Sequence, residues 1–256
     1  MKIFLAGASG AIGRRLIGPL IAGGHEVIAM TRFATQDSRL RALGARTVVA
    51  DGLDKVAVMA AVVTSKPDVV VHQMTALTEF ANVKHFDDEF AMTNQLRTEG
   101  LDILLEAART AGARRFVAQS FGNWTYERSG GPAKVEDDPL DRNPPAVMSR
   151  SLAAIRHLEA AVLDADDIEG VVLRYANLYG PGALIGAGGA MLAQVRKRAV
   201  PIIGSGSGVW SFVHLDDAAS ATVLAIEPAA HGVYNVADDE PAPVAVWLPE
   251  LARIIG

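Results

Sequence analysis

Short apolar runs that alternate with longer segments of helical periodicity constrain the fold of this chain more than any other feature. The runs are continuous in hydrophobicity rather than alternating, which is typical of strands that helices cover on both faces. Because parallel strands need crossover helices between them, this order predicts an α/β fold with a doubly wound parallel sheet. The expected strands are KIFLAG (2–7), EVIAMTR (26–32), RTVVAD (46–51), DVVVHQM (68–74), RFVAQS (115–120) and GVVLRYA (170–176). The expected helices lie near 11–23, 54–65, 87–112 and 149–164.

The regular alternation ends near residue 176, and glycine and proline become frequent in the stretches that follow. Short strands are expected there at Pro201–Ile203 and Trp210–His214. Long irregular segments on a rigid sheet are commonly where ligands bind. We therefore expect residues 1–176 to form the main domain, and residues 177–256 to form mainly a small C-terminal substrate lobe.

Three segments are expected to connect these two parts. The long polar loop 121–147 lies within the main domain in the sequence but should contribute to the substrate cleft. A helix at 216–227 and a strand at 233–237 should return from the lobe to the main domain. The lobe is therefore expected to be interleaved with the main domain and not separable from it.

Composition excludes several classes of function. The net charge of −5 and the lack of a basic run argue against a nucleic-acid partner. The chain has no cysteine, so disulfides, thiolate metal sites and a cysteine nucleophile are excluded. Its six histidines are dispersed, and no metal site is expected. No apolar segment has the length of a membrane span or of a signal-peptide core, so we expect a cytoplasmic protein with no membrane partner.

A glycine-rich turn, GASGAIG, follows the first expected strand and opens the first expected helix. Gly7 allows the sharp turn, Gly10 lets a ligand approach the backbone, and Gly13 lets the helix pack on the strand. The free N–H groups at the start of that helix would face a pyrophosphate. The turn predicts dinucleotide binding, with Ser9, Ala11 and Ile12 as further contacts.

The end of the second expected strand indicates which dinucleotide binds. NAD sites place a carboxylate there for the adenine ribose, whereas this chain has Thr31 and Arg32. A guanidinium suits a 2′-phosphate, so NADP(H) is the preferred cofactor and NAD(H) the alternative. Arg14 could assist. Asp51, followed by Gly52, is placed to meet the adenine edge or, alternatively, to cap the next turn.

Several further motifs, in the correct order, resemble the extended short-chain dehydrogenase/reductase family, in its epimerase/dehydratase branch. They are VVVHQMTA (69–76), Asn94 in FAMTNQLRTEG, LRYANLYGPG (173–182) and WSFVHLDDAA (210–219). The resemblance implies a Rossmann-type NAD(P)-binding domain over residues 1–176. It also implies an oxidoreductase that acts on a small molecule, either nucleotide-sugar-like or another carbonyl or hydroxyl compound. The cofactor contacts that it implies are Met74, Thr75, Ala76, Asn94, Tyr175 and Asn177.

The resemblance also implies catalytic residues, and two of them are missing. In that family a Ser or Thr after the fifth strand, a Tyr and a Lys carry the reaction, and Ser120 matches the hydroxyl position. The Tyr-x-x-x-Lys pair should lie in AVMSRSLAAIRHLEAAV (146–162), where Met148 replaces Tyr and Leu152 replaces Lys. No offset restores the pair, so the family's proton donor does not carry over.

Candidate replacements lie elsewhere in the chain. Tyr126 on the long loop and Tyr175 at a strand end could supply a phenol, although either could simply pack. Asn177 and His214, with Ser120, are candidates for binding substrate, although His214 could instead be structural. Three functions stay open: an enzyme with an unusual proton donor, a non-catalytic NADP(H)-sensing protein, and a non-redox cyclase or lyase. The resemblance implies a homodimer.

Overall fold

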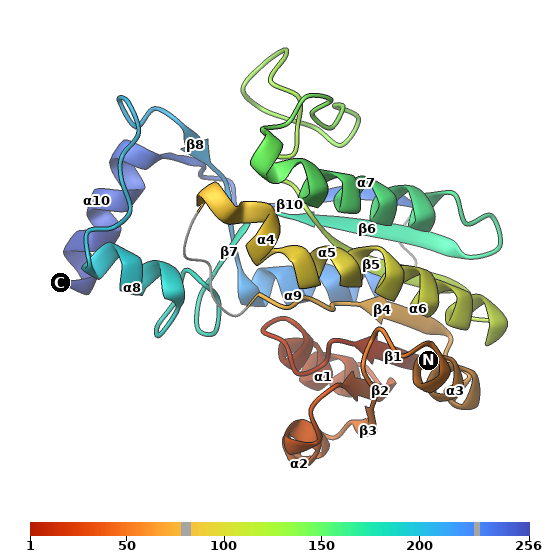
Figure 1. Cartoon of the computed structure of the whole chain (residues 1–256). Coiled ribbons are helices and arrows are strands. Elements are labelled where there is room, and N and C mark those ends of the chain that lie inside the picture. Colours follow the sequence, from red (N-terminus) through yellow and green to blue (C-terminus); the bar gives the residue numbers. More distant parts are fainter. Residues whose placement is uncertain (78–82, 228–230) are drawn as a thin grey trace.

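The computed structural model describes residues 1–77, 83–227 and 231–256 (Figure 1). One central sheet has the strand order β10-β6-β5-β4-β1-β2-β3, and every neighbouring pair in it is parallel. Its strands are β1 (Lys2–Ala6), β2 (Glu26–Thr31), β3 (Arg46–Val49), β4 (Val69–His72), β5 (Arg115–Phe121), β6 (Glu169–Tyr175) and β10 (Gly232–Val236). The predicted doubly wound parallel sheet is confirmed. The strand order reverses between β1 and β4, where such sheets bind ligands.

Helices cover both faces of the sheet, and alternate residues of each strand supply the two cores. In β1, Ile3 and Leu5 face the core under α1 and α9, whereas Phe4 and Ala6 face the core under α3, α6 and α7. Continuous apolar strands are thus explained by burial on both sides. These helices are α1 (Gly13–Ala22), α3 (Lys55–Ser65), α6 (Glu99–Thr110), α7 (Ser149–Leu163) and α9 (Leu215–Ile226).

The helical segment expected near 87–112 consists of three helices, α4 (Phe86–Glu89), α5 (Ala91–Arg97) and α6. The break between α5 and α6 falls at Thr98, whose hydroxyl donates to the carbonyl of Asn94 at 3.0 Å. Such side-chain hydrogen bonds compete with the helix backbone. Helix α2 (Asp37–Ala42) was not predicted from the sequence, and the short strand expected at Pro201–Ile203 is not formed.

The remaining elements form a lobe at one end of the sheet, where Figure 1 shows α8, α10 and β8 together. Strand β7 pairs with β9 in parallel, and β8 pairs with β11 in antiparallel fashion. The rings of Trp210 and Trp247 pack 4.9 Å apart and join β8 to α10. The expected helix 216–227 corresponds to α9 and the expected strand 233–237 to β10, which pairs with β6. The lobe elements are β7 (Asn177–Tyr179), α8 (Ala190–Arg196), β8 (Val209–Trp210), β9 (Phe212–His214), β11 (Ala242–Pro243) and α10 (Val244–Ile255).

None of the helices within the described ranges combines the length and the hydrophobicity that a membrane-spanning segment needs. The longest of them, α7, has 15 residues and packs against the sheet. Its buried residues include Leu158 and Val162. Helix α7 therefore serves to cover the sheet.

Two glycines give a matched test of this packing. A Cβ on Gly170, at the start of β6, would lie 2.1 Å from the carbonyl oxygen of Val162 in α7, whereas a Cβ on the exposed Gly18 of α1 meets nothing within 4 Å. Gly170→Ala should lower the free energy of unfolding by about 2 kcal/mol or more. Gly18→Ala should leave it within about 1 kcal/mol of the wild type, because the helix propensity of alanine is opposed by the crowding of a Cβ against the ring of Pro19. Urea unfolding of both variants measures the difference, and equal midpoints would contradict the packing described.

Candidate functional site

The turn between β1 and α1 brings backbone segments so close together that side chains are excluded. Gly7 has a φ of +85°, and a Cβ there would lie 2.4 Å from the carbonyl oxygen of Gln73. A Cβ on Gly13 would lie 2.4 Å from the carbonyl oxygen of Gly7. Helix α1 begins at Gly13, and within the described ranges no side chain caps it. Its first N–H groups are therefore suited to an anion, and this cradle fits a dinucleotide pyrophosphate.

The end of β2 carries a hydroxyl and a guanidinium. The buried Thr31 donates its hydroxyl to the Ser9 hydroxyl at 3.0 Å, which ties β2 to the glycine turn. The Arg32 guanidinium lies over the Phe33 ring, 4.6 Å from its centroid. This stacking orients Arg32 at the rim of the cavity that both residues line.

A second arginine, Arg14, lies at the same end of the cavity. Its Nη1 donates to the carbonyl of Ser9 at 2.9 Å. Burial, followed by the charges of Arg39 and Arg15, lowers the pKa of Arg14. Since like charges lower the pKa of a cation, the charges of Arg39 and Arg15 act on Arg14 in the same direction as burial.

A cavity of about 790 Å³ extends from the glycine turn, across the ends of the strands, to the lobe. Most of the predicted cofactor contacts line it; the exceptions are Gly13 and Asn94. Residues of the lobe, among them Leu178, Met191 and Trp210, close the far side. The predicted contacts that line the cavity are Gly7, Ser9, Gly10, Ala11, Ile12, Thr31, Arg32, Asp51, Gly52, Met74, Thr75, Ala76, Tyr175 and Asn177.

The middle of the cavity has an aromatic wall. The rings of Phe86 and Phe90 stack with centroids 4.2 Å apart, and the Trp124 ring meets Phe86 edge-on at 5.2 Å. Phe121, at the end of β5, packs against Trp124 and also lines the cavity. Such rings favour a flat, apolar ligand packed against them. Of the predicted loop 121–147, the cavity-lining residues are Phe121, Asn123 and Trp124.

Helix α7 presents apolar side chains to this cavity. Met148, just before α7, and Ile155 line it, and Leu152 is completely buried. Asn94, which does not line the cavity, donates its amide to the Ser151 hydroxyl at 2.9 Å. Asp87 accepts hydrogen bonds from the backbone N–H groups of Arg150 and Ser151 and so caps α7. These contacts fix the helix without placing an acid or base in the cavity.

Ser120 lies outside the cavity. Side chains alternate along a strand, and its neighbours Gln119 and Phe121 are the ones that face the cavity. The Ser120 side chain is 1% exposed and donates to Glu159 Oε1 at 2.7 Å. Glu159 also forms a bidentate ion pair with Arg174, whose Nε donates to Oε1 at 2.9 Å and whose Nη2 donates to Oε2 at 2.7 Å. The geometry therefore gives Ser120 a place in a buried hydrogen-bond network and none among the described residues that line the cavity.

Tyr126 belongs to the same network. Its hydroxyl donates to the side-chain oxygen of Asn235 and accepts from Arg174 Nη1 at 3.0 Å. Arg174 also donates to the carbonyl of Glu136 at 3.1 Å. Tyr126 is buried and does not line the large cavity, so it anchors the long loop to the sheet.

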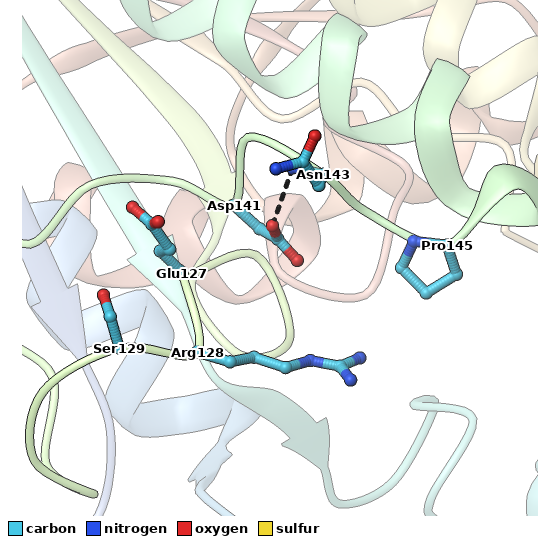
Figure 2. Close-up of a pocket in the computed structure, with 6 residues that line it drawn as sticks. All are labelled: Glu127, Arg128, Ser129, Asp141, Asn143 and Pro145. Atoms are coloured by element: carbon cyan, nitrogen blue, oxygen red, sulfur yellow. Dashed lines mark hydrogen bonds between the residues drawn. The ribbon is translucent and has the colours of Figure 1, made fainter.

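That loop has a hollow of its own, of about 400 Å³ (Figure 2). It is open and polar, and the backbone N–H of Asn143 donates to Asp141 Oδ1 at 2.9 Å across one side. None of its lining residues lines the large cavity. They are Glu127, Arg128, Ser129, Asp141, Asn143 and Pro145.

Tyr175 lies at the floor of the large cavity. The Thr222 hydroxyl donates to the carbonyl of Ala218 at 2.7 Å, so the Tyr175 hydroxyl donates to Thr222 Oγ1 at 2.6 Å. Its oxygen accepts from Gln73 Nε2 at 3.2 Å. Burial raises the pKa of Tyr175 to about 12. Tyr175 therefore stays neutral near pH 7, and its proton is held by the protein.

The two remaining candidates for binding substrate, His214 and Asn177, form hydrogen bonds with backbone groups. His214 is the N-cap residue of α9, where its Nδ1 accepts from the backbone N–H of Asp216 at 3.3 Å, and it does not line the cavity. Asn177 lines the cavity and donates its amide to the carbonyl of Ser211 at 3.1 Å. His214 thus caps a helix, which was the structural alternative, and Asn177 leaves its side-chain oxygen for a ligand.

Sequence reasoning missed Arg97, whose side chain is 4% exposed and lines the cavity. Arg97 lies on the buried face of α5 and α6, in helical register with Thr93, Leu101 and Leu104. A charged residue at a core position of an apolar helical pattern was the signal that would have revealed it. Gln119, Phe86 and Phe90 were also missed.

The sequence profile of the NAD dependent epimerase/dehydratase family matches residues 3–237. The chain belongs to this family. It is therefore a nicotinamide-dependent enzyme of the oxidoreductase type that acts on a small molecule, as predicted from the motifs. This agrees with the glycine cradle and the strand order described above.

Several known proteins are similar to this chain. A protein from Streptomyces sp., named 3-diazoavenalumate denitrifying reductase, is 44% identical over 260 residues, which cover all of this chain and 82% of that protein. A UDP-glucose 4-epimerase from Mycolicibacterium smegmatis is 28% identical over 91% of this chain and 75% of its own length. The crystal structure of Thermus thermophilus UDP-glucose 4-epimerase in complex with NAD superposes with a TM-score of 0.77 at 27% identity. It matches all of this chain and 84% of that one.

The buried state of Tyr175 predicts a pH dependence. Its pKa rises from 10.0 to about 12 on folding, so its contribution to stability is present below pH 10 and is lost as the pH rises towards 12. Tyr175→Phe should remove one late-titrating tyrosine from an ultraviolet absorbance titration and weaken the loss of stability above pH 10. A tyrosinate signal near neutral pH that disappears in this variant would contradict the structure and would favour Tyr175 as a proton donor.

Proposed function

We propose that this enzyme uses NADPH to reduce an aromatic diazo compound, replacing the carbon–nitrogen bond with a carbon–hydrogen bond and releasing dinitrogen. When bound, the reduced nicotinamide supplies a hydride. An arenediazonium that accepts a hydride loses dinitrogen and becomes the arene. The two electrons and the single hydrogen both come with the hydride, so the overall change consumes no proton.

This proposal rests mainly on the observation that the described residues of the cavity offer no proton donor where one is expected. Among the described residues that line it, none is a histidine or lysine, Asp51 is the only carboxylate, and the hydroxyl of Tyr175 donates its proton to Thr222. Asp51 follows β3, which lies four strand spacings from β5, or about 19 Å at the usual separation. Reduction of a carbonyl or epimerisation of an alcohol needs general acid–base catalysis. Reduction of a diazonium does not.

Similarity supports the same chemistry. The Streptomyces relative, 44% identical over the whole chain, is named for a diazo substrate and for a reduction that removes nitrogen. The aromatic wall formed by Phe86, Phe90 and Trp124 suits a flat ring better than a sugar, whose hydroxyls need many hydrogen-bond partners. These two lines of support are independent of each other.

The chain's own residues have three tasks in this proposal. The turn from Gly7 to Gly13 holds the pyrophosphate on the N-terminus of α1. The aromatic wall orients the substrate ring. Apolar side chains such as Met148 and Ile155 exclude water, which would otherwise attack a diazonium.

NADP(H) is the preferred cofactor in this proposal. Arg32 and Arg14 line one end of the cavity, and the described end of β2 has no carboxylate. A 2′-phosphate can accept hydrogen bonds from two guanidinium groups there, whereas the 2′-hydroxyl of NAD(H) gains little from them. A cytoplasmic location and a homodimer stay predictions of the sequence.

A labelled reduction tests the chemistry. The purified enzyme should oxidise NADPH with 4-carboxybenzenediazonium or 4-methylbenzenediazonium faster than an enzyme-free mixture and release dinitrogen in equal amount. With NADPH deuterated at C4 on the transferred side, the arene should carry one deuterium, and in D2O with unlabelled NADPH it should carry none. Mass spectrometry of the product and gas analysis measure both results.

Other outcomes would overturn the proposal. Label entering the arene carbon from D2O would require a proton donor. Turnover of ketones but not of diazo compounds would identify a carbonyl reductase. Binding of NADPH without oxidation by either class would favour the sensing protein, and product formed with no change in NADPH would favour the lyase.

Cofactor selectivity is tested by Arg32→Gln. Loss of one charge-assisted contact to a phosphate should weaken NADPH binding by roughly 10- to 100-fold. NADH binding should change by less than about threefold, because NADH lacks the phosphate. Isothermal titration calorimetry measures both constants, with Arg128→Gln on the exposed loop as the control. Equal losses for the two cofactors would contradict the preference for NADPH.

A further inference from the structure

Arg97 is a buried cation that the proposed reaction does not yet explain. It comes at the end of α5, and its side chain is 4% exposed. Although it is buried within the protein, it forms part of the wall of the large cavity. The guanidinium is therefore shielded from bulk water and accessible to a ligand.

The part of the protein that the structure describes supplies this guanidinium with no direct partner. Within the described ranges, Arg97 has no hydrogen bond and no ion pair. The negative charge that raises its pKa is that of Glu159. Both Glu159 oxygens are already bonded to Arg174, and one of them also accepts from Ser120.

Within the group formed by Glu159, Arg174 and Arg97, the charges therefore do not balance. Glu159 and Arg174 neutralise each other, and Arg97 leaves one positive charge in excess in this group. Burial lowers the pKa of Arg97 to about 10, which is still well above neutral pH, so the side chain stays charged. A buried charge without a partner is costly, and side chains of this kind are found where a ligand supplies the opposite charge.

We infer that Arg97 is the anion receptor of the cavity and that the substrate is a flat aromatic compound whose carboxylate or phenolate oxygen pairs with this guanidinium. The inference rests on the proposed function, since it concerns the same cavity and adds the charge of the substrate. The aromatic wall holds the ring, and Arg97 holds the oxyanion through paired N–H···O bonds. The neutral polar groups Gln119 and Asn123 also line the cavity but offer no charge.

This arrangement has a consequence for a diazo substrate. A bare arenediazonium is a cation and would be repelled by Arg97. A diazonium that carries its own carboxylate or phenolate has no net charge, and its anionic oxygen can approach Arg97. A phenolate conjugated with the diazo group makes that group less electrophilic. Pairing with a guanidinium reduces this donation and favours acceptance of a hydride.

Binding to the protein saturated with NADP⁺ tests the inference without turnover. The carboxylate probes are trans-cinnamate and its neutral isostere cinnamamide, and the phenolate probes are 4-nitrophenolate and its neutral methyl ether, 4-nitroanisole. Calorimetry should show that at least one anion binds the wild-type protein more tightly than its neutral counterpart. Arg97→Met should weaken binding of that anion by about 30-fold or more and leave the neutral probe within about twofold. The carboxylate and phenolate arms distinguish the two sources of the oxyanion.

Two further variants make the result specific. Arg97→Lys keeps the charge but loses the paired geometry, so it should recover part of the affinity and keep the fold if Arg97→Met unfolds. Arg128→Met removes an exposed arginine from the loop and should bind the anion as the wild type does.

Three outcomes would overturn the inference. One is equal binding of anions and neutral probes by the wild-type protein. Another is an Arg97→Met variant that binds the anion unchanged. The third is a loss of NADP⁺ affinity alone, which would place Arg97 on the cofactor ribose. Failure of the proposed function looks different: anions would bind through Arg97, yet neither diazonium would be reduced. Faster reduction of 4-methylbenzenediazonium than of 4-carboxybenzenediazonium would contradict the inference that Arg97 binds an anionic group of the substrate. It would still support the proposed reductase activity.

Discussion

Two backbone contacts that only glycine allows fix the geometry on which the rest of the site depends. Gly7 lies against the carbonyl of Gln73, and Gly13 lies against the carbonyl of Gly7. The first contact joins the ends of β1 and β4, the neighbours between which the strand order reverses. Gln73 in turn donates to Tyr175 at the end of β6. The position of the cofactor turn and the floor of the cavity are thus coupled through three strands.

The distribution of charge around the cavity follows from which elements reach it. Arg14 and Arg32 come from α1 and the end of β2, at one end. Arg97 comes from the end of α5. The protein has a net charge of −5, yet the charged side chains among the described residues of the cavity are three arginines and one carboxylate, Asp51. Such a cavity is suited to anionic ligands.

How far the sequence could predict this structure depended on whether the signal was local. The strands and the glycine turn were predicted well, because continuous apolar runs and three spaced glycines act within a few residues of themselves. The single helix expected near 87–112 was wrong, because the breaks at Phe90 and Thr98 involve neither proline nor glycine. Only the hydroxyl of Thr98, bonded to Asn94, marks the second break.

The candidate site was harder to predict, because side-chain direction is decided by tertiary structure. A shift of one residue along β5 separates Ser120, which faces Glu159, from Phe121, which faces the cavity. Tyr126 lies six residues further along the chain, but the loop turns it towards Asn235 and Arg174. Arg97 was missed for the opposite reason. Its helical register predicts burial, and burial of an arginine becomes informative only once its lack of a partner is known.

If the substrate is a diazonium, replacing the expected tyrosine and lysine removes a proton donor and also removes two side chains that would react with the substrate. Phenolates couple with diazonium ions to form azo compounds, and amines form triazenes, so either side chain beside the reacting group would be modified by its own substrate. Met148 and Leu152 carry neither group. Tyr175, the one tyrosine among the described residues of the cavity, is protected because its pKa is raised to about 12 and its hydroxyl donates to Thr222. The apolar wall then serves the same end as the missing catalytic pair, since it keeps both water and protein nucleophiles away from an electrophile that needs only a hydride.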